Sequence, residues 1–258
     1  MSLRISVLGS SSSGNCAFIA THRTRILLDA GFSTTQIRKR LAQLGESLDS
    51  IDALVISHEH SDHISGLQSL TAKCNLPVFI TPATLDAIRP RIEGLKPVLM
   101  QAGEPFEVGD LKVSPFSVPH DAADPLGFHF EAEGLKIAHV TDLGYFTELV
   151  VQRLRGSHVL VLESNHDLDM LRAAPYPWFV KQRIMSRHGH LSNEMAGRFF
   201  DESFDGLAQY IVLAHLSENS NHPQIAQVVA ATALEKRAFK LQNLWLASKS
   251  APTPMIEM

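Results

Sequence analysis

The chain has 258 residues, of which 45% are hydrophobic and 19% charged, proportions typical of a globular protein that can bury a sizeable core. A formal net charge of −4 excludes a uniformly basic surface, so any contact with nucleic acid must be local. Two cysteines are too few for a disulfide framework, and no apolar run has the length of a membrane span or of a signal-peptide core. We therefore expect a cytoplasmic protein that does not bind membranes.

Short apolar runs dominate the beginning of the chain. They predict strands over 4–8, 16–20 and 25–29, followed by an amphipathic helix over 33–44 that ends before a glycine. The small polar loop between the first two strands is either a hairpin turn or a loop that contacts substrate through Ser12 and Asn15. Asp29 closes the third run, where it can cap the following helix.

A histidine-rich loop follows the buried strand predicted over 52–56 and precedes a helical pattern. It contains His58, His60, Asp62 and His63. Residues two apart on an extended segment point the same way, so His58 and His60 can converge on one point. Where the chain turns helical, Asp62 and His63 can reach a second point nearby. Imidazoles and carboxylates are ligands of divalent metals, so this loop predicts a metal site.

Strands and helices alternate through the middle of the chain. The predicted strands cover 78–80, 98–100, 106–108, 111–118, 127–131 and 135–140, and the predicted helices begin near Pro82 and cover 146–154. Antiparallel hairpins within this alternation favour a mixed α/β sandwich over a doubly wound parallel sheet. His120 and Asp142 each follow the end of a predicted strand and are further candidate ligands.

The last third of the chain has a basic stretch and a final candidate ligand. Strands are predicted over 157–162, 210–214 and 241–247, with helices starting at Ser192 or Asn193 and covering 222–237. His215 follows the second of these strands. Residues 172–198 contain five basic side chains against one glutamate, which indicates either a solvated helix face or a helix pair that faces substrate. Residues 251–258 contain two prolines and no periodicity, so we expect a disordered tail after a single domain over 1–250.

The spacing of His58, His60, Asp62 and His63 resembles the signature of the metallo-β-lactamase superfamily. The resemblance implies an αββα sandwich, in which two mixed sheets are flanked by helices, with a two-metal site at one sheet edge. Asp29 would support the ligands from behind, and Asp142 would bridge the metals. One ion would be held by His58, His60 and His120, and the other by Asp62, His63 and His215. The absence of a thiolate allows Zn²⁺ or Mn²⁺, and a hydroxide between two such ions would be the nucleophile of a metal-dependent hydrolase.

Several other segments resemble the YycJ/WalJ-like branch of this superfamily; they lie at 8–16, 119–128, 163–167, 189–193 and 215–219. That branch implies a bacterial nuclease with 5′ to 3′ exonuclease activity on double-stranded DNA. The Arg187-His188 pair departs from its pattern. Catalytic roles are expected for Asp62, Asp29 and His190. Candidate substrate-binding residues are Ser12, Asn15, Asn165, His166, Lys181, Arg183, Arg187, His190, Ser217 and Asn219.

Other functions remain open at this point. An RNA-processing nuclease is an alternative, although the stretch from Asp142 to His215 is too short for a large inserted β-CASP domain. A hydrolase of small thioesters, lactones or phosphodiesters fits the acidic net charge. A non-catalytic binding module is disfavoured because no ligand is missing. His190 stands at a predicted helix start, where it can bind a phosphate, donate a proton as general acid, or merely pack.

Overall fold

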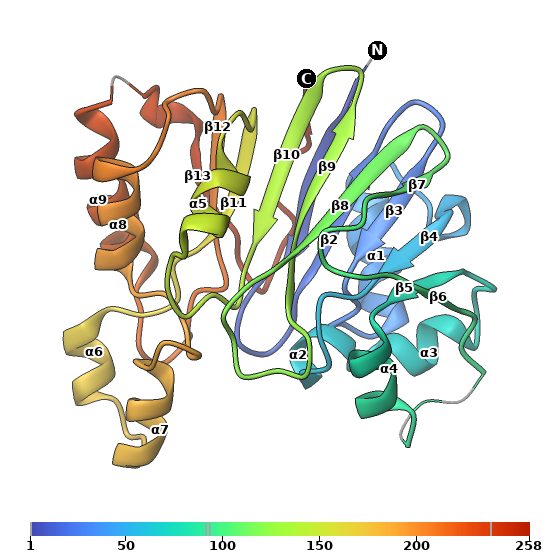
Figure 1. Cartoon of the computed structure of the whole chain (residues 1–258), viewed down its shortest axis with the longest axis horizontal. Helices are drawn as coiled ribbons and strands as arrows, with labels where there is room; N and C mark the ends of the chain where they lie inside the picture. The colour runs from blue at the N-terminus through green and yellow to red at the C-terminus, as the bar shows by residue number, and fades with distance from the viewer. Residues whose placement is uncertain (1, 91, 93, 238) are drawn as a thin grey trace.

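Two mixed sheets face one another in the computed structural model, which describes residues 2–90, 92, 94–237 and 239–258 (Figure 1). The strands of the first sheet lie in the order β14 (Ile256–Glu257), β1 (Arg4–Gly9), β2 (Cys16–Ala20), β3 (Arg25–Leu28), β4 (Ala53–Val55), β5 (Val78–Ile80) and β6 (Pro97–Leu99). Those of the second lie in the order β13 (Leu244–Leu246), β12 (Tyr210–Ala214), β11 (Val159–Glu163), β10 (Leu135–Val140), β9 (Leu126–Ala132), β8 (Leu111–Ser117) and β7 (Phe106–Val108).

Helices cover the outer faces of both sheets. The first sheet carries α1 (Thr34–Gln43), α2 (Ser61–Ile64), α3 (Leu67–Thr71) and α4 (Pro82–Ile88), with the 3₁₀ turn η1 (Leu48–Ser50). The second carries α5 (Glu148–Leu154), α8 (Asn193–Glu202) and α9 (Pro223–Glu235), with the 3₁₀ turn η2 (Leu241–Asn243). Two further helices, α6 (Leu168–Ala173) and α7 (Trp178–Ile184), project beyond the end of the second sheet (Figure 1). The predicted αββα sandwich is therefore confirmed.

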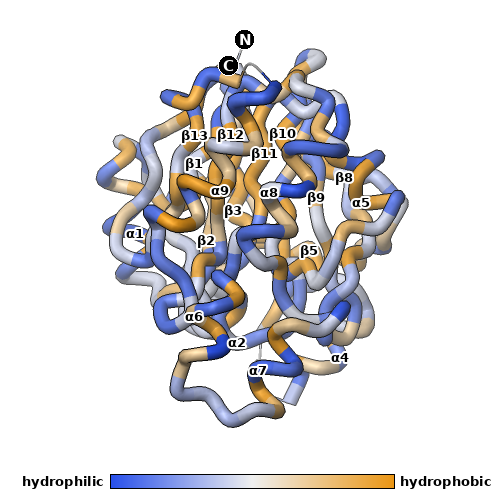
Figure 2. Tube along the Cα trace, turned by 90° about the vertical axis from the view of Figure 1, so that its left-hand side faces the viewer, coloured by the Kyte–Doolittle hydropathy of each residue, from blue (hydrophilic) through white to orange (hydrophobic). Residues whose placement is uncertain are grey.

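The alternation of side chains along β11 shows how the apolar layers form. Val159 and Val161 pack in the layer between the two sheets, whereas Leu160 and Leu162 pack against the outer helices. The strand is buried on both faces, which is why it reads as an unbroken apolar run rather than an alternating one. Figure 2 shows the hydrophobic strands enclosed between more hydrophilic outer segments. No helix in the described part of the chain is long and apolar enough to cross a membrane.

Strand direction brings the candidate ligands to one edge of the sandwich. β10, β11 and β12 run parallel, as do β3 and β4, so the carboxyl ends within each group meet at the same edge. β8 runs antiparallel to β9, which runs antiparallel to β10, so β8 ends there as well. In Figure 1 this edge lies at the bottom, beside α2, whereas both termini lie at the top.

The end of the chain differs from the expected disordered tail. Ile256 pairs with Ile5, and Glu257 pairs with Arg4, so β14 extends the first sheet. The Thr253 backbone amide donates to the Val7 carbonyl at 2.9 Å. Ile256 is buried between the sheets. The prediction was wrong because a two-residue strand has no periodicity of its own, whereas the free edge of β1 supplies hydrogen bonds that hold it.

Candidate metal centre

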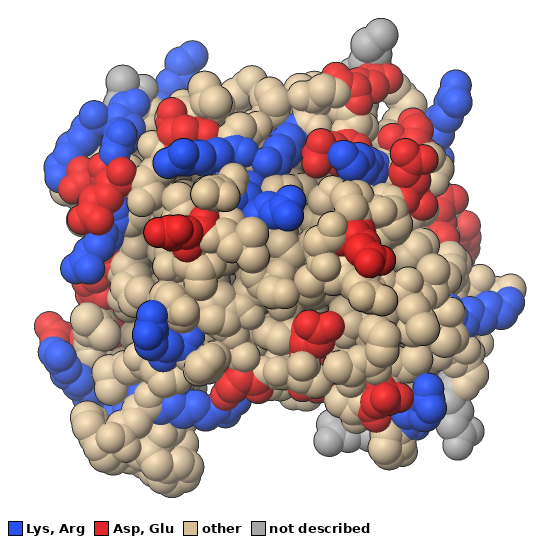
Figure 3. Space-filling model, in the orientation of Figure 1, with Lys and Arg blue, Asp and Glu red and all other residues tan. Residues whose placement is uncertain are grey.

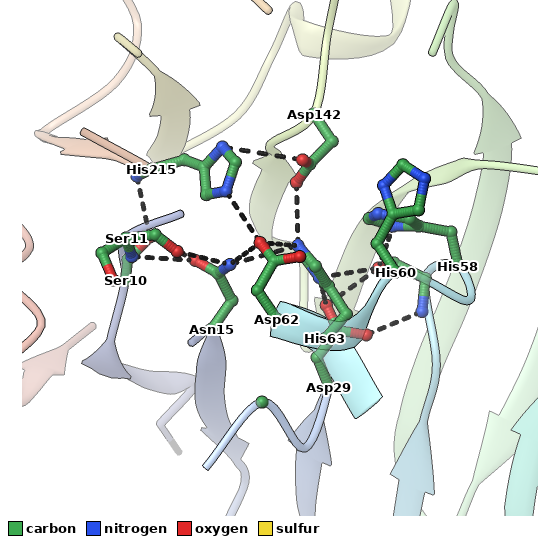
Figure 4. Close-up of polar contacts among 12 residues, drawn as sticks. Ser10, Ser11, Asn15, Asp29, His58, His60, Asp62, His63, Asp142 and His215 are labelled. Carbon is green, nitrogen blue, oxygen red and sulfur yellow. Dashed lines mark hydrogen bonds and ion pairs between the residues drawn. The ribbon is translucent and has the colours of Figure 1, made fainter. Parts of the chain in front are cut away.

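Three imidazoles, from His58, His60 and His120, form the first group of candidate ligand atoms, all within 4.8 Å of one another (Figure 4 shows His58 and His60). His58 and His60 lie in the loop between β4 and α2, and His120 follows β8. His120 Nδ1 donates to the Gly189 carbonyl at 3.0 Å, which leaves its Nε2 free to face the centre. His60 Nδ1 lies 3.2 Å from that Nε2 atom.

The second group contains Asp62, His63, Asp142 and His215. His63 Nδ1 donates to Asp29 Oδ2 at 2.7 Å, so the opposite ring nitrogen, Nε2, faces the centre. That Nε2 lies 3.1 Å from Asp142 Oδ2 and 3.4 Å from Asp62 Oδ2. His215 Nε2 lies 3.2 Å from the same Asp62 oxygen. These contacts bring together side chains from both sheets and from α2 (Figure 4).

Asp29 lies behind this group and does not cap α1, whose first turn is capped by the Ser33 hydroxyl. In addition to His63, Asp29 accepts hydrogen bonds from the Ser57 backbone amide at 2.8 Å and from the Ser57 hydroxyl at 2.9 Å. It therefore fixes both the histidine loop and the orientation of one imidazole, which is the arrangement that supports a metal ligand from behind.

Glu163, at the end of β11, was not among the predicted site residues. Its fully buried carboxylate accepts from His215 Nδ1 at 2.7 Å and from His190 Nδ1 at 2.9 Å. The backbone amides of Leu143 and Leu191 donate to its other oxygen. A carboxylate that ends an apolar strand was the available signal, the same signal that drew attention to Asp29. Glu163 thus fixes His215, a ligand of the second group, and His190, a partly exposed histidine beside it. These three residues and Asp142 form a third group of candidate ligand atoms that overlaps the second.

Three residues of the centre adopt a left-handed backbone conformation that favours glycine. They are Asp29, Asp142 and His215, with φ values of 62°, 57° and 56°. Asp29 and His215 directly follow a strand and Asp142 follows one residue later, where the sharp turn aims each side chain across the sheet edge. Strain of this kind persists only where surrounding contacts impose it, and it concentrates at functional sites.

The carboxyl groups of Asp62, Asp142 and Glu163 have lowered pKa values. Burial alone would raise their pKa values, but His63 lowers the pKa of Asp62, and His215 lowers that of Asp142 well below its ordinary value. His190 lowers the pKa of Glu163 to about 2 against the same effect of burial. Burial alone would lower the pKa of His215, but Asp142 and its neighbours raise it to about 10. The centre therefore concentrates negative charge that a cation can neutralise in place of protons.

Two buried atoms of the centre make no hydrogen bond within the described residues: His58 Nε2 and Asp142 Oδ2, the latter having only the ion-pair contact with His63 Nε2 at 3.1 Å. Buried polar atoms are almost always satisfied, and an exception calls for an explanation. One atom belongs to each ligand group, and both are of the type that binds divalent metals. The residues present therefore fit divalent metal ions, and the two atoms without a hydrogen bond are the observation that supports this fit.

Some of the predicted substrate-binding residues lie beneath the centre rather than at its surface. The Asn15 amide donates to Asp62 Oδ2 at 3.0 Å, and the Asn165 amide donates to the His215 carbonyl at 2.8 Å. Both asparagines are buried, as are His166 and Ser217. Their positions suit support of the ligands rather than contact with a substrate. Ser12 and Asn219 are exposed, and the Asn219 amide donates to the Tyr176 hydroxyl at 2.8 Å.

The basic stretch does not form one cationic helix face. Lys181 is buried and donates to the Arg172 carbonyl at 2.5 Å. Arg183 is exposed and pairs with Asp121, next to His120 in the chain. Arg187 lies over the Tyr145 ring, with its guanidinium carbon 4.3 Å from the ring centroid. The stretch spans α6, α7 and α8, so its charges are distributed over three elements, and only some of them can meet a ligand.

The chain is similar to known proteins over nearly its whole length. Residues 24–215 match the family described as the beta-lactamase superfamily domain. The chain is 35% identical to exodeoxyribonuclease YycJ of Bacillus anthracis, with 93% of this chain and 92% of the relative covered. It is 30% identical to exodeoxyribonuclease WalJ of Streptococcus pneumoniae, with 99% of this chain and 98% of the relative covered.

Solved structures share the fold. The metallo-beta-lactamase fold protein YhfI from Bacillus subtilis superposes with a TM-score of 0.77 over 100% of both chains, at 16% identity. Zn²⁺-bound PqqB from Methylobacterium extorquens superposes with a TM-score of 0.71 at 19% identity, over 97% of this chain and 99% of the other. At these identities the likeness establishes the arrangement of sheets and helices.

Proposed function

The chain belongs to the metallo-β-lactamase superfamily, and from that membership we propose that it is a dinuclear-metal hydrolase of phosphodiesters that degrades DNA. The finer proposal is a 5′ to 3′ exonuclease on double-stranded DNA. It is supported by relatives named exodeoxyribonucleases, which this chain matches over nearly their full length.

One observation carries the proposal: two groups of ligand atoms lie side by side, and each contains a buried atom that makes no hydrogen bond. Two divalent ions held there would lower the pKa of a water molecule and neutralise charge on a phosphodiester. His58, His60 and His120 would hold one ion. Asp62, His63 and His215 would hold the other, and Asp142 would contact both. With no thiolate in the set, Zn²⁺ and Mn²⁺ both fit.

His190 supplies a proton or hydrogen-bond donor toward the leaving oxygen of the phosphodiester. The centroid of its ring lies 5.0 Å from the ring centroid of His120 and 5.1 Å from that of His215. Glu163 holds Nδ1, which leaves Nε2 to donate a hydrogen bond to the phosphate or a proton to the leaving group. Oxygen atoms of Glu163 and Asp142 lie 2.9 Å and 3.8 Å from this Nδ1 atom and hold the ring in place.

The proposal is tested with a panel of labelled duplex DNA, single-stranded DNA, RNA and a generic phosphodiester, each with Mn²⁺ or Zn²⁺. We expect duplex DNA to be degraded from its 5′ ends. Asp62→Asn and His63→Ala should abolish hydrolysis while the protein stays folded, because both side chains sit at the rigid start of α2. Preferential cleavage of RNA would reject a DNA substrate. So would hydrolysis of the generic phosphodiester by a protein that cleaves none of the nucleic acids.

His190→Ala should lower the rate about 10²–10⁴-fold, the usual contribution of a general acid. His188→Ala is the matched control, because His188 is exposed two residues away and belongs to none of the three groups of candidate ligand atoms. Metal content and thermal midpoint are measured for both variants. If the rate of His190→Ala falls only in proportion to lost metal or lost folding, the residue is structural.

A further inference from the structure

The α7 helix exposes two neighbouring aromatic side chains, Trp178 and Phe179. Their exposed fractions are 61% and 71%. The other large apolar side chains that are exposed in the described residues are aliphatic and lie elsewhere: Val98, Leu99, Leu149, Leu207 and Val228. In Figure 3 the corner of the molecule where α7 lies is an uncharged projection with basic side chains next to it.

The helix is attached directly to the candidate centre. The His190 backbone amide donates to the Ile184 carbonyl at the end of α7, at 2.9 Å. The turn between them needs Gly189, because a Cβ there would lie 2.2 Å from that carbonyl oxygen. Arg183 pairs with Asp121, the residue after His120. α7 is therefore held by residues adjacent to His190 and to a candidate ligand.

The geometry of the helix places the rings within reach of a strand bound at the centre. Trp178 precedes Ile184 by six residues, which corresponds to about 9 Å along the helix axis. This is the length of roughly two to three stacked nucleotides, at about 3.4 Å each. Phe179 and Arg183 are four residues apart and so share one face of the helix. The exposed Phe179 ring and the exposed Arg183 guanidinium therefore form a row along α7 that leads to Asp121 and the metal centre.

The chemistry of this surface fits nucleobases. Bases present flat π-faces that stack on aromatic rings in a sequence-tolerant manner, while phosphates favour nearby cations. The same stretch of chain has exposed arginines at 172, 183 and 187, of which the first pairs with Asp169 and the second with Asp121. Two rings form too small a patch for a stable protein interface, which buries about 800 Å² on each partner. Continuity with the centre and charge complementarity both favour the strand that is being hydrolysed.

We propose that Trp178 and Phe179 form a stacking platform for bases of the nucleic-acid strand that enters the metal centre. The inference rests on the proposed nuclease function and adds the element that holds the strand. It accounts for why two large rings remain in water on a helix whose other end is hydrogen-bonded to His190.

The test compares ring loss with ring exchange in the metal-loaded protein. Trp178→Leu and Phe179→Leu keep an apolar side chain but remove the π-face, whereas Trp178→Phe and Phe179→Tyr retain it. Binding is measured with a phosphorothioate oligonucleotide that resists cleavage. We expect each leucine variant to bind about tenfold more weakly and each aromatic variant to bind within about twofold of wild type. Leu207→Ala is the control for an exposed apolar side chain elsewhere.

Cleavage assays separate this inference from the nuclease proposal. A dinucleotide is too short to reach α7, so the leucine variants should hydrolyse it at the wild-type rate while degrading longer DNA more slowly. If wild-type protein degrades DNA and the leucine variants bind it as tightly as wild type, the platform is rejected and the nuclease proposal stands. If wild-type protein binds no nucleic acid, both are rejected. If the leucine variants instead only change the oligomeric state, the rings belong to an interface between copies.

Discussion

Asp142 combines two properties that a pair of substitutions can separate. Its carboxylate contacts His63 within the second ligand group, and its backbone has a φ of 57°. Asp142→Ala and Asp142→Gly should both lose metal and activity. Only the glycine variant is free of backbone strain, so it should be more stable than the alanine variant by about 1 kcal/mol. Thermal denaturation of the two metal-free variants measures this difference, and equal midpoints would show that the turn is not strained.

Glu163 should act through the two imidazoles that it holds. Glu163→Gln replaces an acceptor of two ring N–H groups with an amide of the same shape, so we expect activity to fall about 10- to 100-fold. Glu59→Gln is the matched control, because within the described part of the chain Glu59 accepts from the Ala123 backbone amide and holds no imidazole. If the rates of the two variants fall equally, a specific role for Glu163 is contradicted.

The difference between Asp29 and Glu163 shows what the sequence reveals about single residues. Asp29 could be assigned a supporting role because the resemblance of the histidine loop pointed to it. Glu163 also ends an apolar strand, but its partners are 27 and 52 residues away in the chain. The parallel pairing of β11 with β12 brings His215 to Glu163. The segment between α7 and α8, where the Leu191 carbonyl accepts from the Asn165 amide, brings His190 there. A contact of this range has no local pattern, so it could not be predicted.

The β7–β8 turn joins the two sheets through Asp110. The hydroxyls of Thr21 and Thr24, in the β2–β3 turn, donate to Asp110 Oδ1 at 2.5 Å and 2.6 Å. Gly109 precedes Asp110 with a φ of 58°, and a Cβ there would lie 2.2 Å from the Thr24 hydroxyl. This close approach explains why glycine occupies the turn.

Gly109→Ala should therefore destabilise the protein by about 1–3 kcal/mol through backbone strain and loss of this contact. Denaturant unfolding measures the loss. Gly134→Ala is the control, because Gly134 also has a positive φ, in the β9–β10 turn, but a Cβ there meets open space. Equal losses for the two variants would mean that strain alone matters and that the link between sheets contributes nothing.

Element predictions were most accurate where a strong local pattern existed. The apolar run over 210–214 is β12 as predicted, and the hairpin around Gly109 is present. The strand predicted over 241–247 is shorter, because η2 occupies Leu241–Asn243 and leaves three residues for β13. The final strand, β14, was missed because its stability comes from the edge of β1 and not from its own sequence.

The whole molecule is organised so that the centre spans the two sheets. Asp29 and His58 follow strands of the first sheet, while His120, Asp142 and His215 follow strands of the second. Ions held between them would stabilise the folded state over the unfolded chain, which has no preformed site. At a free concentration about 100 times the dissociation constant, one ion contributes about 2.7 kcal/mol.

Removal of metal with a chelator should therefore lower the thermal midpoint, and adding Mn²⁺ or Zn²⁺ should restore it. Asp62→Asn should show a smaller response, since one ligand of the second group is weakened. A midpoint that does not respond to chelation in the wild-type protein would mean that no ion links the sheets.

The overall architecture was predictable because a short motif with four candidate ligands resembles a family whose fold is known. What the motif could not supply is the surface that meets the substrate. The buried positions of Asn165 and Lys181, and the exposure of Trp178, depend on how α6 and α7, which lie between β11 and α8 in the chain, fold beyond the end of the sheet. Charge along the chain did not predict which side chains face solvent.

The central claim, a dinuclear metal-dependent nuclease, is tested most directly by titrating metal-free protein with Mn²⁺ while following degradation of 5′-labelled duplex DNA. We predict no degradation without metal and a rate that rises to a plateau at two ions per chain, with the bound metal measured in the same samples. Degradation that proceeds at full rate without metal, or protein that binds no metal across the titration, would contradict the account.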